Sequence, residues 1–341
     1  MRRPLQMKAT HLLLMLGLTA LAAPAQALNI VLSNDDGFET ANIRALYQRL
    51  KAAGHDVVVS APTQNNSGRG GSMNFLVPVT PMAKASRHGS VAAGSPGVGK
   101  DPGDADVYYV DGTPVMSMLH GLDVVAVKRW GQQPDLVVSG FNEGNNTGLI
   151  NNSSGTVNNL LYAVNRGIPA IAASYEGTEA RAHTALAEGA LEYEIADVVV
   201  KLIEELEDKR AEGQPLLPPG VGLNINIPKV TAGQAATLPF RFARMGKATE
   251  YQPVFYEKLS DSPVAVGYGA GVAYPGISFA NDVIAPPAGV VIAQDDSELS
   301  EFNVMKDHAI PVTVVEGVPQ GRRSNEERVK IQLRDLLGAA P

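Results

Sequence analysis

The stretch Leu28-Asn29-Ile30-Val31-Leu32-Ser33-Asn34-Asp35-Asp36-Gly37 decides the fold of this chain. Apolar residues dominate its first half, which is typical of a buried strand, and the strand ends in two adjacent carboxylates and a glycine. Two neighbouring carboxylates repel each other, and a chain accepts that cost to hold a cation or to carry out chemistry. The alternative interpretation is a solvated Asn-Asp-Gly turn, which these residues also favour.

Strand and helix patterns alternate over the first two thirds of the chain. Apolar runs predict strands at 28–33, 56–59, 107–110, 136–138, 168–173 and 222–227. Helical periodicity predicts helices at 41–53, 114–122, 157–166 and 179–206. This order predicts an α/β fold with three layers, α/β/α, in which helices cover both faces of a Rossmann-like, mostly parallel sheet.

The pattern changes after residue 228. Residues 229–315 combine Gly/Pro-rich pieces with short alternating runs, which predicts β-rich excursions, and 325–337 reads as a terminal amphipathic helix. We therefore expect a core at 28–228 and, at 229–341, a β-rich arm and C-terminal helix of the same domain. This arm either mediates dimerisation or simply packs on the core.

The segment 80–105 is rich in Ala, Gly, Ser and Pro, lacks periodicity and is predicted to be a surface loop. It contains Gly94-Ser-Pro-Gly-Val-Gly-Lys100, which resembles a phosphate-binding P-loop. The resemblance fails because Asp101 replaces the Ser or Thr that would reach magnesium, and because no apolar strand precedes it.

The first 27 residues have the pattern of a secretory signal peptide. Arg2, Arg3 and Lys8 give a positive start, 11–23 is nearly all apolar, and Ala25-Gln26-Ala27 fits a cleavage site. We expect cleavage after Ala27, a periplasmic or secreted protein, and no membrane association afterwards.

Composition excludes several functions. The net charge is −7 without a basic stripe, which argues against binding a nucleic-acid polymer. The chain has no cysteine, so thiolate catalysis and thiolate metal sites are absent and the core must hold the fold without disulfides.

Three polar loops follow predicted strands and share one edge of the sheet, where ligands bind in open α/β folds. The first carries Asp35 and Asp36, the second is 61–72, and the third runs from Ser139 through 151–157 into a helix. Their carboxylate, amide and hydroxyl oxygens suit Mg²⁺, Mn²⁺ or Ca²⁺, whereas the six histidines show no zinc-ligand spacing.

The segment Ser154-Gly155-Thr156 opens a predicted helix, and its backbone amides form a natural anion site. An oxygen-coordinated cation beside a helix N-terminus is the arrangement that phosphoryl transfer requires. The alternative interpretation is an ordinary N-cap at Ser154 or Thr156.

At these loops the sequence resembles the survival-protein-E (SurE) family of metal-dependent nucleotidases and acid phosphatases. The resembling segments, which together span most of 28–228, are 30–37, Ala61-Pro62 with Ser67-Gly68, Asp111-Gly-Thr-Pro114, 134–142, Asn146-Thr-Gly148, Ser154-Gly-Thr-Val157, Gly167-Ile-Pro-Ala170 and Leu223-Asn-Ile-Asn-Ile-Pro228.

The resemblance implies specific roles for these residues. A divalent cation, Mg²⁺ or Mn²⁺, would be held by Asp35, Asp36, Ser67 and Asn142, while Asn146 and Ser154-Gly155-Thr156 would meet the phosphate. The implied reaction is hydrolysis of phosphate monoesters, above all nucleoside 5′- and 3′-monophosphates, in which Asp35 and Asp36 are catalytic. The family also forms dimers or tetramers through C-terminal elements.

The sequence departs from the family pattern at several places. The second loop shows Thr63, Asn65 and Asn66 in place of the usual Asp and Arg, and the helix after Val157 carries Asn158-Asn159 and Tyr162-Ala163. These departures leave two other readings open: a non-catalytic exported metal- or ligand-binding protein, and a helper of a membrane-bound partner that acts through 229–315.

Overall fold

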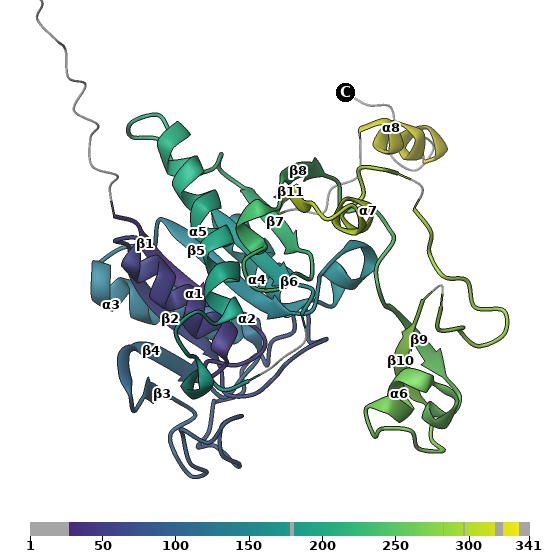
Figure 1. Cartoon of the computed structure of the whole chain (residues 1–341), viewed down its shortest axis with the longest axis horizontal. Coiled ribbons are helices and arrows are strands. Elements are labelled where there is room, and N and C mark those ends of the chain that lie inside the picture. The colour runs from purple at the N-terminus through teal and green to yellow at the C-terminus, as the bar shows by residue number, and fades with distance from the viewer. Residues whose placement is uncertain (1–26, 178–180, 282, 296, 318–322, 334–341) are drawn as a thin grey trace, which may run out of the picture.

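A nine-stranded sheet forms the centre of the computed structural model, which describes residues 27–177, 181–281, 283–295, 297–317 and 323–333 (Figure 1). The strand order is β3-β4-β2-β1-β5-β6-β7-β11-β8. The strands are β1 (Asn29–Ser33), β2 (Asp56–Pro62), β3 (Val98–Asp101), β4 (Asp104–Val110), β5 (Leu136–Glu143), β6 (Ala170–Tyr175), β7 (Val221–Ile227), β8 (Phe240–Ala243) and β11 (Ile310–Glu316).

Six neighbouring strands, from β4 to β7, run parallel, and the antiparallel strands β3 and β11 flank them. The chain adds β2 and β4 on one side of β1 and then returns to place β5 on its other side. The β1–β5 boundary is therefore a topological switch point, and the carboxyl ends of these strands border the crevice where such sheets bind ligands.

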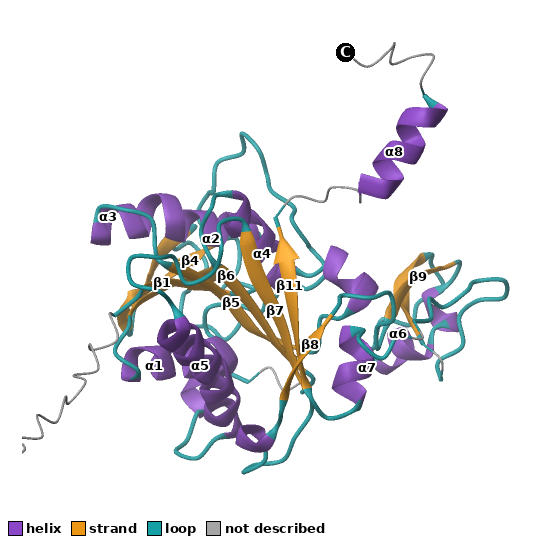
Figure 2. Ribbon diagram, turned by 90° about the horizontal axis from the view of Figure 1, so that it is seen from above, coloured by secondary structure: helices purple, strands orange, loops and turns teal. Residues whose placement is uncertain are grey.

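Helices cover both faces of the sheet, which confirms the predicted three layers (Figure 2). One face carries α1 (Ala41–Ala52) and α5 (Leu191–Lys209). The other carries α2 (Pro114–His120), which continues through η1 (Gly121–Ala126) into α3 (Val127–Trp130), and α4 (Gly155–Asn165).

Alternating side chains of the central strands fill two separate cores. Ile30 and Leu32 of β1 pack on the α1/α5 side, whereas Val31 packs with Met118 and Leu160 on the α2/α4 side. All of these side chains are fully buried. A strand buried on both faces reads as a continuous apolar run, which explains why the sequence pattern identified it.

The predicted helix at 179–206 is wrong in its first part, because α5 begins only at Leu191. Gly189 has a positive φ of 77° and Ala190 is extended, so helical backbone cannot pass through them. The residues before them pack against the start of α1 instead, where the Ala41 amide donates to Arg181 O at 2.9 Å. Residues 178–180 lie outside the described part of the chain.

Residues beyond 228 divide between the sheet and a separate unit. β11 pairs with β7 and β8 pairs with β11, so part of the segment expected as an excursion completes the central sheet. The rest forms a two-stranded antiparallel hairpin of β9 (Gln252–Tyr256) and β10 (Gly276–Ala280) with the short helix α6 (Pro263–Gly267), which projects from the main body (Figure 1).

The remaining C-terminal elements are α7 (Glu301–Lys306) and α8 (Arg323–Gln332). α8 confirms the predicted terminal helix as far as it is described, and residues 334–341 lie outside the described set. The predicted loop at 80–105 is irregular only as far as 97, because β3 and the start of β4 form its end.

The predicted signal peptide falls almost entirely on residues 1–26, outside the described part. Among the helices that are described, none combines the length and the apolar character needed to cross a bilayer.

Candidate active site

The turn after β1 presents two aspartates at the switch point. Asn34 closes the turn, since its Oδ1 accepts from the Gly37 amide and its Nδ2 donates to Gly37 O, both at 3.2 Å. Gly37 has a positive φ of 117°, a conformation that favours glycine. Asp35 and Asp36 are therefore held by local hydrogen bonds, and both side chains are buried.

Asp35 lies against the start of α4. Its Oδ1 accepts from the Thr156 hydroxyl at 2.6 Å, and the Gly155 amide also hydrogen-bonds to its carboxylate. Burial raises the pKa of Asp35, and these hydrogen bonds act in the opposite direction. A Cβ at Gly155 would lie 2.7 Å from Asp35 Cβ, so only glycine permits this close approach.

Of the two aspartates, Asp36 is the one whose ionised form the surroundings disfavour more. Its Oδ2 accepts from the Glu143 amide at 3.1 Å, and its pKa is raised well above the usual range by burial and then by the charges of Asp35 and Glu143. Such a carboxylate is costly to ionise unless a positive charge lies nearby.

Asn142 lies near the end of β5, directly before Glu143, whose amide binds Asp36. Its Nδ2 donates to Glu143 O at 3.0 Å and to Gly144 O at 2.8 Å, which fixes the amide so that its oxygen is the free end. Within the described residues, Asn142 Oδ1 and Asp36 Oδ1 are both buried and both lack a hydrogen-bond partner. Buried oxygens of this kind call for a ligand, and a hard cation fits them.

Ser67 belongs to the loop that follows β2. The Asn66 amide donates to Asp35 O at 2.7 Å, which ties this loop to the aspartate turn. The Ser67 side chain itself is exposed, and its amide donates to Asn65 Oδ1 at 2.7 Å. The structure thus brings Asp35, Asp36 and Asn142 into one buried site and places Ser67 one residue beyond the loop's contact with it.

The expected anion site lies at the first turn of α4. Ser154 is the N-cap, and its Oγ accepts from the Val157 amide at 3.0 Å, so this hydroxyl is used within the helix. Backbone amides at a helix N-terminus lack acceptors within the helix and carry the positive end of its dipole. Gly155 and Thr156 provide such amides beside the carboxylate of Asp35.

Asn146 lies in a neighbouring network of buried amides. Its Nδ2 donates to Ser174 Oγ at 2.9 Å, its amide donates to Asn226 Oδ1 at 2.7 Å, and its carbonyl accepts from Asn224 Nδ2 at 3.2 Å. β6 and β7 supply these partners, so the sheet fixes the position of Asn146.

Two charged residues that the sequence patterns did not indicate support this site. Arg87, from the loop before β3, donates to Asp36 O at 2.7 Å and forms a salt bridge with Glu143 at 3.3 Å. Arg87 thus supplies a guanidinium beside the acidic pair. No signal in the segment 80–105 could have identified it.

The second of these charged residues is Glu301, the first residue of α7. It is fully buried, and its carboxylate accepts from Asn224 Nδ2 at 2.7 Å, Asn151 Nδ2 at 3.0 Å and the Gly148 amide at 3.3 Å. It therefore joins the loop after Asn146 to β7. Sequence separations of 77 to 153 residues hide this connection from any local pattern.

The unusual residues of α4 hold the second loop. Asn158 Nδ2 donates to Ser154 O at 2.8 Å and Tyr162 Oη donates to Gly71 O at 3.5 Å. A Cβ at Gly71 would lie 2.9 Å from Asn158 Oδ1. Asn158 and Tyr162 thus pack directly against the loop that carries Ser67.

The described residues contain no group of three or more His, Cys, Asp or Glu side chains that could hold a metal ion. The donor set here is of another type, two carboxylates with an amide oxygen. Hard cations accept such a set.

The fold and this crevice define an α/β protein whose acidic pair lies at the switch point, beside a helix N-terminus. Residues 30–252 match the family described as Survival protein SurE, and this range is more than half of the chain. The chain therefore belongs to the SurE family, as its sequence motifs predicted.

Relatives and a solved structure agree with this assignment. An acid phosphatase of Yarrowia lipolytica is 38% identical over 231 residues, which cover 66% of this chain but only 61% of that protein. The 5′-nucleotidase SurE of Methanocella arvoryzae is 33% identical over 217 residues, which cover 63% of this chain and 72% of that protein. The crystal structure of the SurE protein from Aquifex aeolicus superposes with a TM-score of 0.61 at 26% identity, over 90% of this chain and all of that one.

Proposed function

We propose that this protein hydrolyses phosphate monoesters with the help of a divalent cation, Mg²⁺ or Mn²⁺, and that nucleoside 5′- and 3′-monophosphates are its substrates. The observation that carries the proposal is the pair of buried, unpartnered oxygens, Asp36 Oδ1 and Asn142 Oδ1, beside the N-terminus of α4. The names of the relatives, acid phosphatase and 5′-nucleotidase SurE, support the same reaction class.

The residues that would hold the cation are Asp35, Asp36, Asn142 and Ser67. When bound, the cation lowers the pKa of a water molecule and neutralises phosphoryl oxygens. Burial and the charges of Asp35 and Glu143 raise the pKa of Asp36, and a positive charge held here would favour the ionised form of its carboxylate.

The chain's own residues supply orientation and charge stabilisation. Thr156 and the Gly155 amide fix the carboxylate of Asp35, and a fixed carboxylate loses little entropy when it acts as a general base. The Thr156 amide in the first turn of α4 and the side chain of Asn146 would stabilise negative charge that develops on the phosphoryl oxygens.

The test is phosphate release from p-nitrophenyl phosphate and from nucleoside 5′- and 3′-monophosphates, with the purified protein in EDTA, Mg²⁺ or Mn²⁺. We expect turnover only with the cation, and loss of turnover in Asp35→Asn without unfolding. Asp123→Asn is the matched control, because this exposed carboxylate pairs with Arg166 outside the crevice.

Two outcomes contradict the proposal. Wild-type turnover in Asp35→Asn would remove the role assigned to that residue. Cation binding by calorimetry without turnover of any phosphate ester would instead favour the non-catalytic binding protein.

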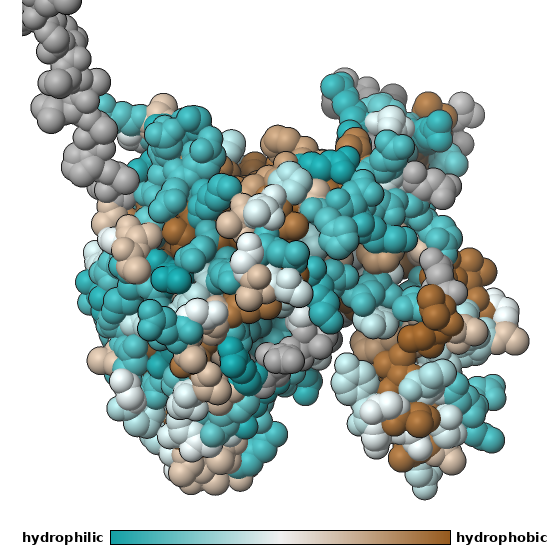
Figure 3. All heavy atoms as spheres, in the orientation of Figure 1, coloured by the Kyte–Doolittle hydropathy of each residue, from teal (hydrophilic) through white to brown (hydrophobic). Residues whose placement is uncertain are grey.

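We further propose that the hairpin mediates self-association into a homodimer or homotetramer. One face of the hairpin is apolar and exposed: Phe255 and Ile277 face each other across the strands and are 65% and 68% exposed. Apolar side chains gather over this unit on the molecular surface (Figure 3). Large exposed apolar patches mark interaction sites.

Light scattering of the eluted protein tests this assembly. We expect a multiple of the chain mass for the wild type and the monomer mass for Phe255→Asp/Ile277→Asp, with hydrolysis retained if each crevice is complete within one chain. A monomeric wild type would refute the proposal.

We also propose export through the leader at 1–27. The leader has a positively charged start, an apolar centre and small residues before Leu28, which is the pattern of a secretory signal peptide. The first strand, β1, begins at Asn29, just after the expected cleavage position, which is consistent with this proposal. N-terminal sequencing of the protein from the periplasm or medium should start at Leu28. An intact leader on a protein that remains in the cytoplasm would contradict it.

A further inference from the structure

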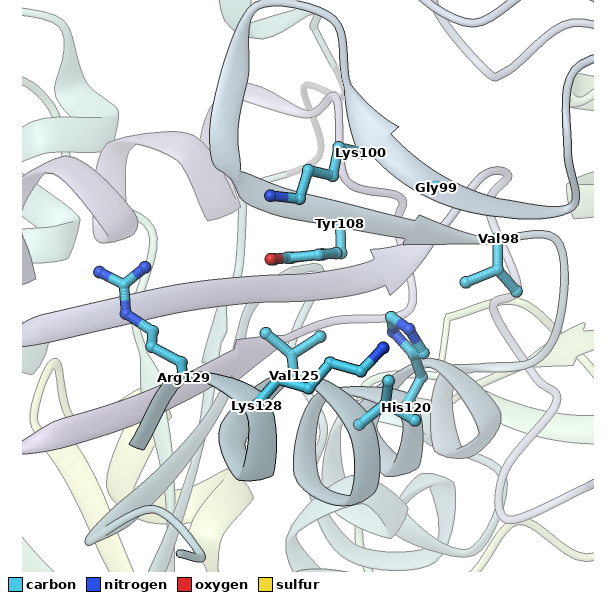
Figure 4. A pocket seen from close by; sticks show the side chains of 9 residues that line it. Val98, Gly99, Lys100, Tyr108, His120, Val125, Lys128 and Arg129 are labelled. Atoms are coloured by element: carbon cyan, nitrogen blue, oxygen red, sulfur yellow. The ribbon is translucent and has the colours of Figure 1, made fainter. Parts of the chain in front are cut away.

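A second concave site lies on the α2 side of the sheet, where β3 and β4 meet the end of the α2–η1–α3 helix (Figure 4). Its volume is about 410 Å³. The strands contribute Lys100 and Tyr108, and the helical segment contributes His120, Val125, Lys128 and Arg129. None of these residues takes part in the crevice at the ends of β1 and β5.

The charge of this pocket is opposite to that of the whole protein. Three cationic side chains line it and no carboxylate does, in a chain whose net charge is −7. Arg129 is neutralised by Asp56 and Asp106. By contrast, Lys100 and Lys128 have no carboxylate partner within 4.0 Å among the described residues, so their charge is available to a ligand.

The aromatic and apolar side chains give the pocket a second property. The Lys100 ammonium lies 5.0 Å from the ring centroid of Tyr108, and Figure 4 shows its side chain extended over that ring. Val125 adds an aliphatic surface on the helical side. A cationic group above an aromatic ring, with an aliphatic wall opposite, suits a ligand that has both a charged head and an apolar body.

His120 is fixed in one tautomer by its neighbours. The Ser60 hydroxyl donates to Ser117 O at 2.7 Å, so the contact of 3.0 Å between Ser60 Oγ and His120 Nδ1 requires Nδ1 to be the donor. Burial and the nearby Lys128 lower the pKa of His120, which favours the neutral ring. Nε2 is therefore an acceptor, able to bind a hydroxyl or N–H of a ligand.

The helical wall of the pocket has an uncommon geometry. Between α2 and α3 the chain forms a π-helical segment, Gly121–Ala126, whose wider turn lies directly on the sheet. A Cβ at Gly121 would lie 2.7 Å from Val31 Cγ1, so the backbone reaches the sheet only because this residue is glycine. π-Helical segments within helices occur frequently at functional sites.

We propose that this pocket binds a small organic anion, a phosphate or carboxylate group carried on a planar ring. The ammonium groups of Lys100 and Lys128 supply the positive charge that attracts the anionic head, and the ring packs against Val125 and Tyr108. The two possible heads share one chemistry, charge-assisted hydrogen bonding from lysine, and differ in charge.

The chain offers a reporter for this site. Trp130 is its single tryptophan, follows Arg129 directly and donates to Asp56 Oδ2 at 2.8 Å, the same carboxylate that Arg129 binds. Titration with phenylphosphonate, whose C–P bond an ester hydrolase does not cleave, should give saturable heat in calorimetry and a change in Trp130 fluorescence. Benzoate tests the carboxylate head, and inorganic phosphate tests the head without a ring.

The variants Lys100→Met and Lys128→Met keep the aliphatic stems and remove the charges. Each should weaken binding roughly tenfold or more, as expected for loss of one charge-assisted hydrogen bond, with an unchanged melting curve and unchanged hydrolysis of p-nitrophenyl phosphate. Lys258→Met, on the exposed hairpin, is the matched control and should bind as the wild type does.

The catalytic crevice could also take phenylphosphonate, and Asp36→Asn separates the two sites. Binding retained in Asp36→Asn but lost in Lys128→Met supports the pocket whether or not the protein is a phosphatase. Absence of saturable heat with all three probes, or binding that both lysine variants keep, would overturn the proposal.

Discussion

Replacement of Glu301 by glutamine should change how the stability of this protein depends on pH. The Glu301 carboxylate is fully buried, and burial raises its pKa from 4.5 to about 7 although Asn224, Asn151 and the Gly148 amide donate to it. Desolvation therefore outweighs the hydrogen bonds that the carboxylate accepts, and the ionised form is costly in the folded state.

The sign and size of the effect follow from this shift. Because the folded pKa is above the unfolded value, the proton-linked contribution of Glu301 to stability is complete below pH 4.5 and is lost as pH rises through 7. At about 1.4 kcal/mol per pKa unit, the loss amounts to about 3 kcal/mol in the free energy of unfolding. Glutamine does not titrate, so Glu301→Gln lacks this loss.

Urea unfolding of both proteins, followed by Trp130 fluorescence at a series of pH values, measures the difference. Other groups titrate equally in the two proteins and cancel. The stability of Glu301→Gln relative to the wild type should rise by about 3 kcal/mol from below pH 4.5 to above about pH 8, on top of a constant offset from the altered hydrogen bonds. A difference independent of pH would refute the reasoning.

Three further outcomes are expected. Asp36→Asn should be more stable than the wild type in EDTA at neutral pH, since it removes a buried charge. It should also lose the stabilisation by Mn²⁺, which reaches about 2.7 kcal/mol at a hundredfold excess over Kd. An undiminished Mn²⁺ effect on the urea midpoint would contradict this. Gly155→Ala should lower the free energy of unfolding by about 1–3 kcal/mol and reduce phosphate release, because the new Cβ would lie 2.7 Å from both Asp35 Cβ and Pro114 Cγ. Wild-type turnover would argue against this close approach. Asp101→Asn should cost about 3–5 kcal/mol in thermal or urea unfolding, because it leaves the buried Arg44, now 2.8 Å from the Asp101 carboxylate, without a counter-charge. Asp123→Asn, at an exposed pair, should cost about 1 kcal/mol or less.

The crevice shows how far local sequence patterns reach. The run 28–33 predicts a buried strand because both of its faces are apolar, and the turn at Asn34 follows from residues that hydrogen-bond their own backbone. Parallel strands place the loops after them at one edge, which is why the order of strands and loops along the chain predicts that the loops carrying Asp35, Asp36 and Asn142 meet.

Other features depend on contacts that no local pattern records. The periodicity at 179–206 predicts one helix, yet Gly189 and the packing of Arg181 against α1 delay the helix to Leu191. Tertiary contacts override helix propensity in such cases, because propensity contributes less than about 1 kcal/mol per residue.

The sequence by itself determined the class of fold, the acidic pair and the helix N-terminus beside it, since apolar periodicity, turn residues and N-caps act within a few positions of the chain. Only the tertiary structure decided that Arg87 and Glu301 support the site, that β11 and β8 complete the sheet, and that lysines from a strand and a helix share one pocket. Burial and long-range hydrogen bonding set these features, and both exist only once distant segments have packed together.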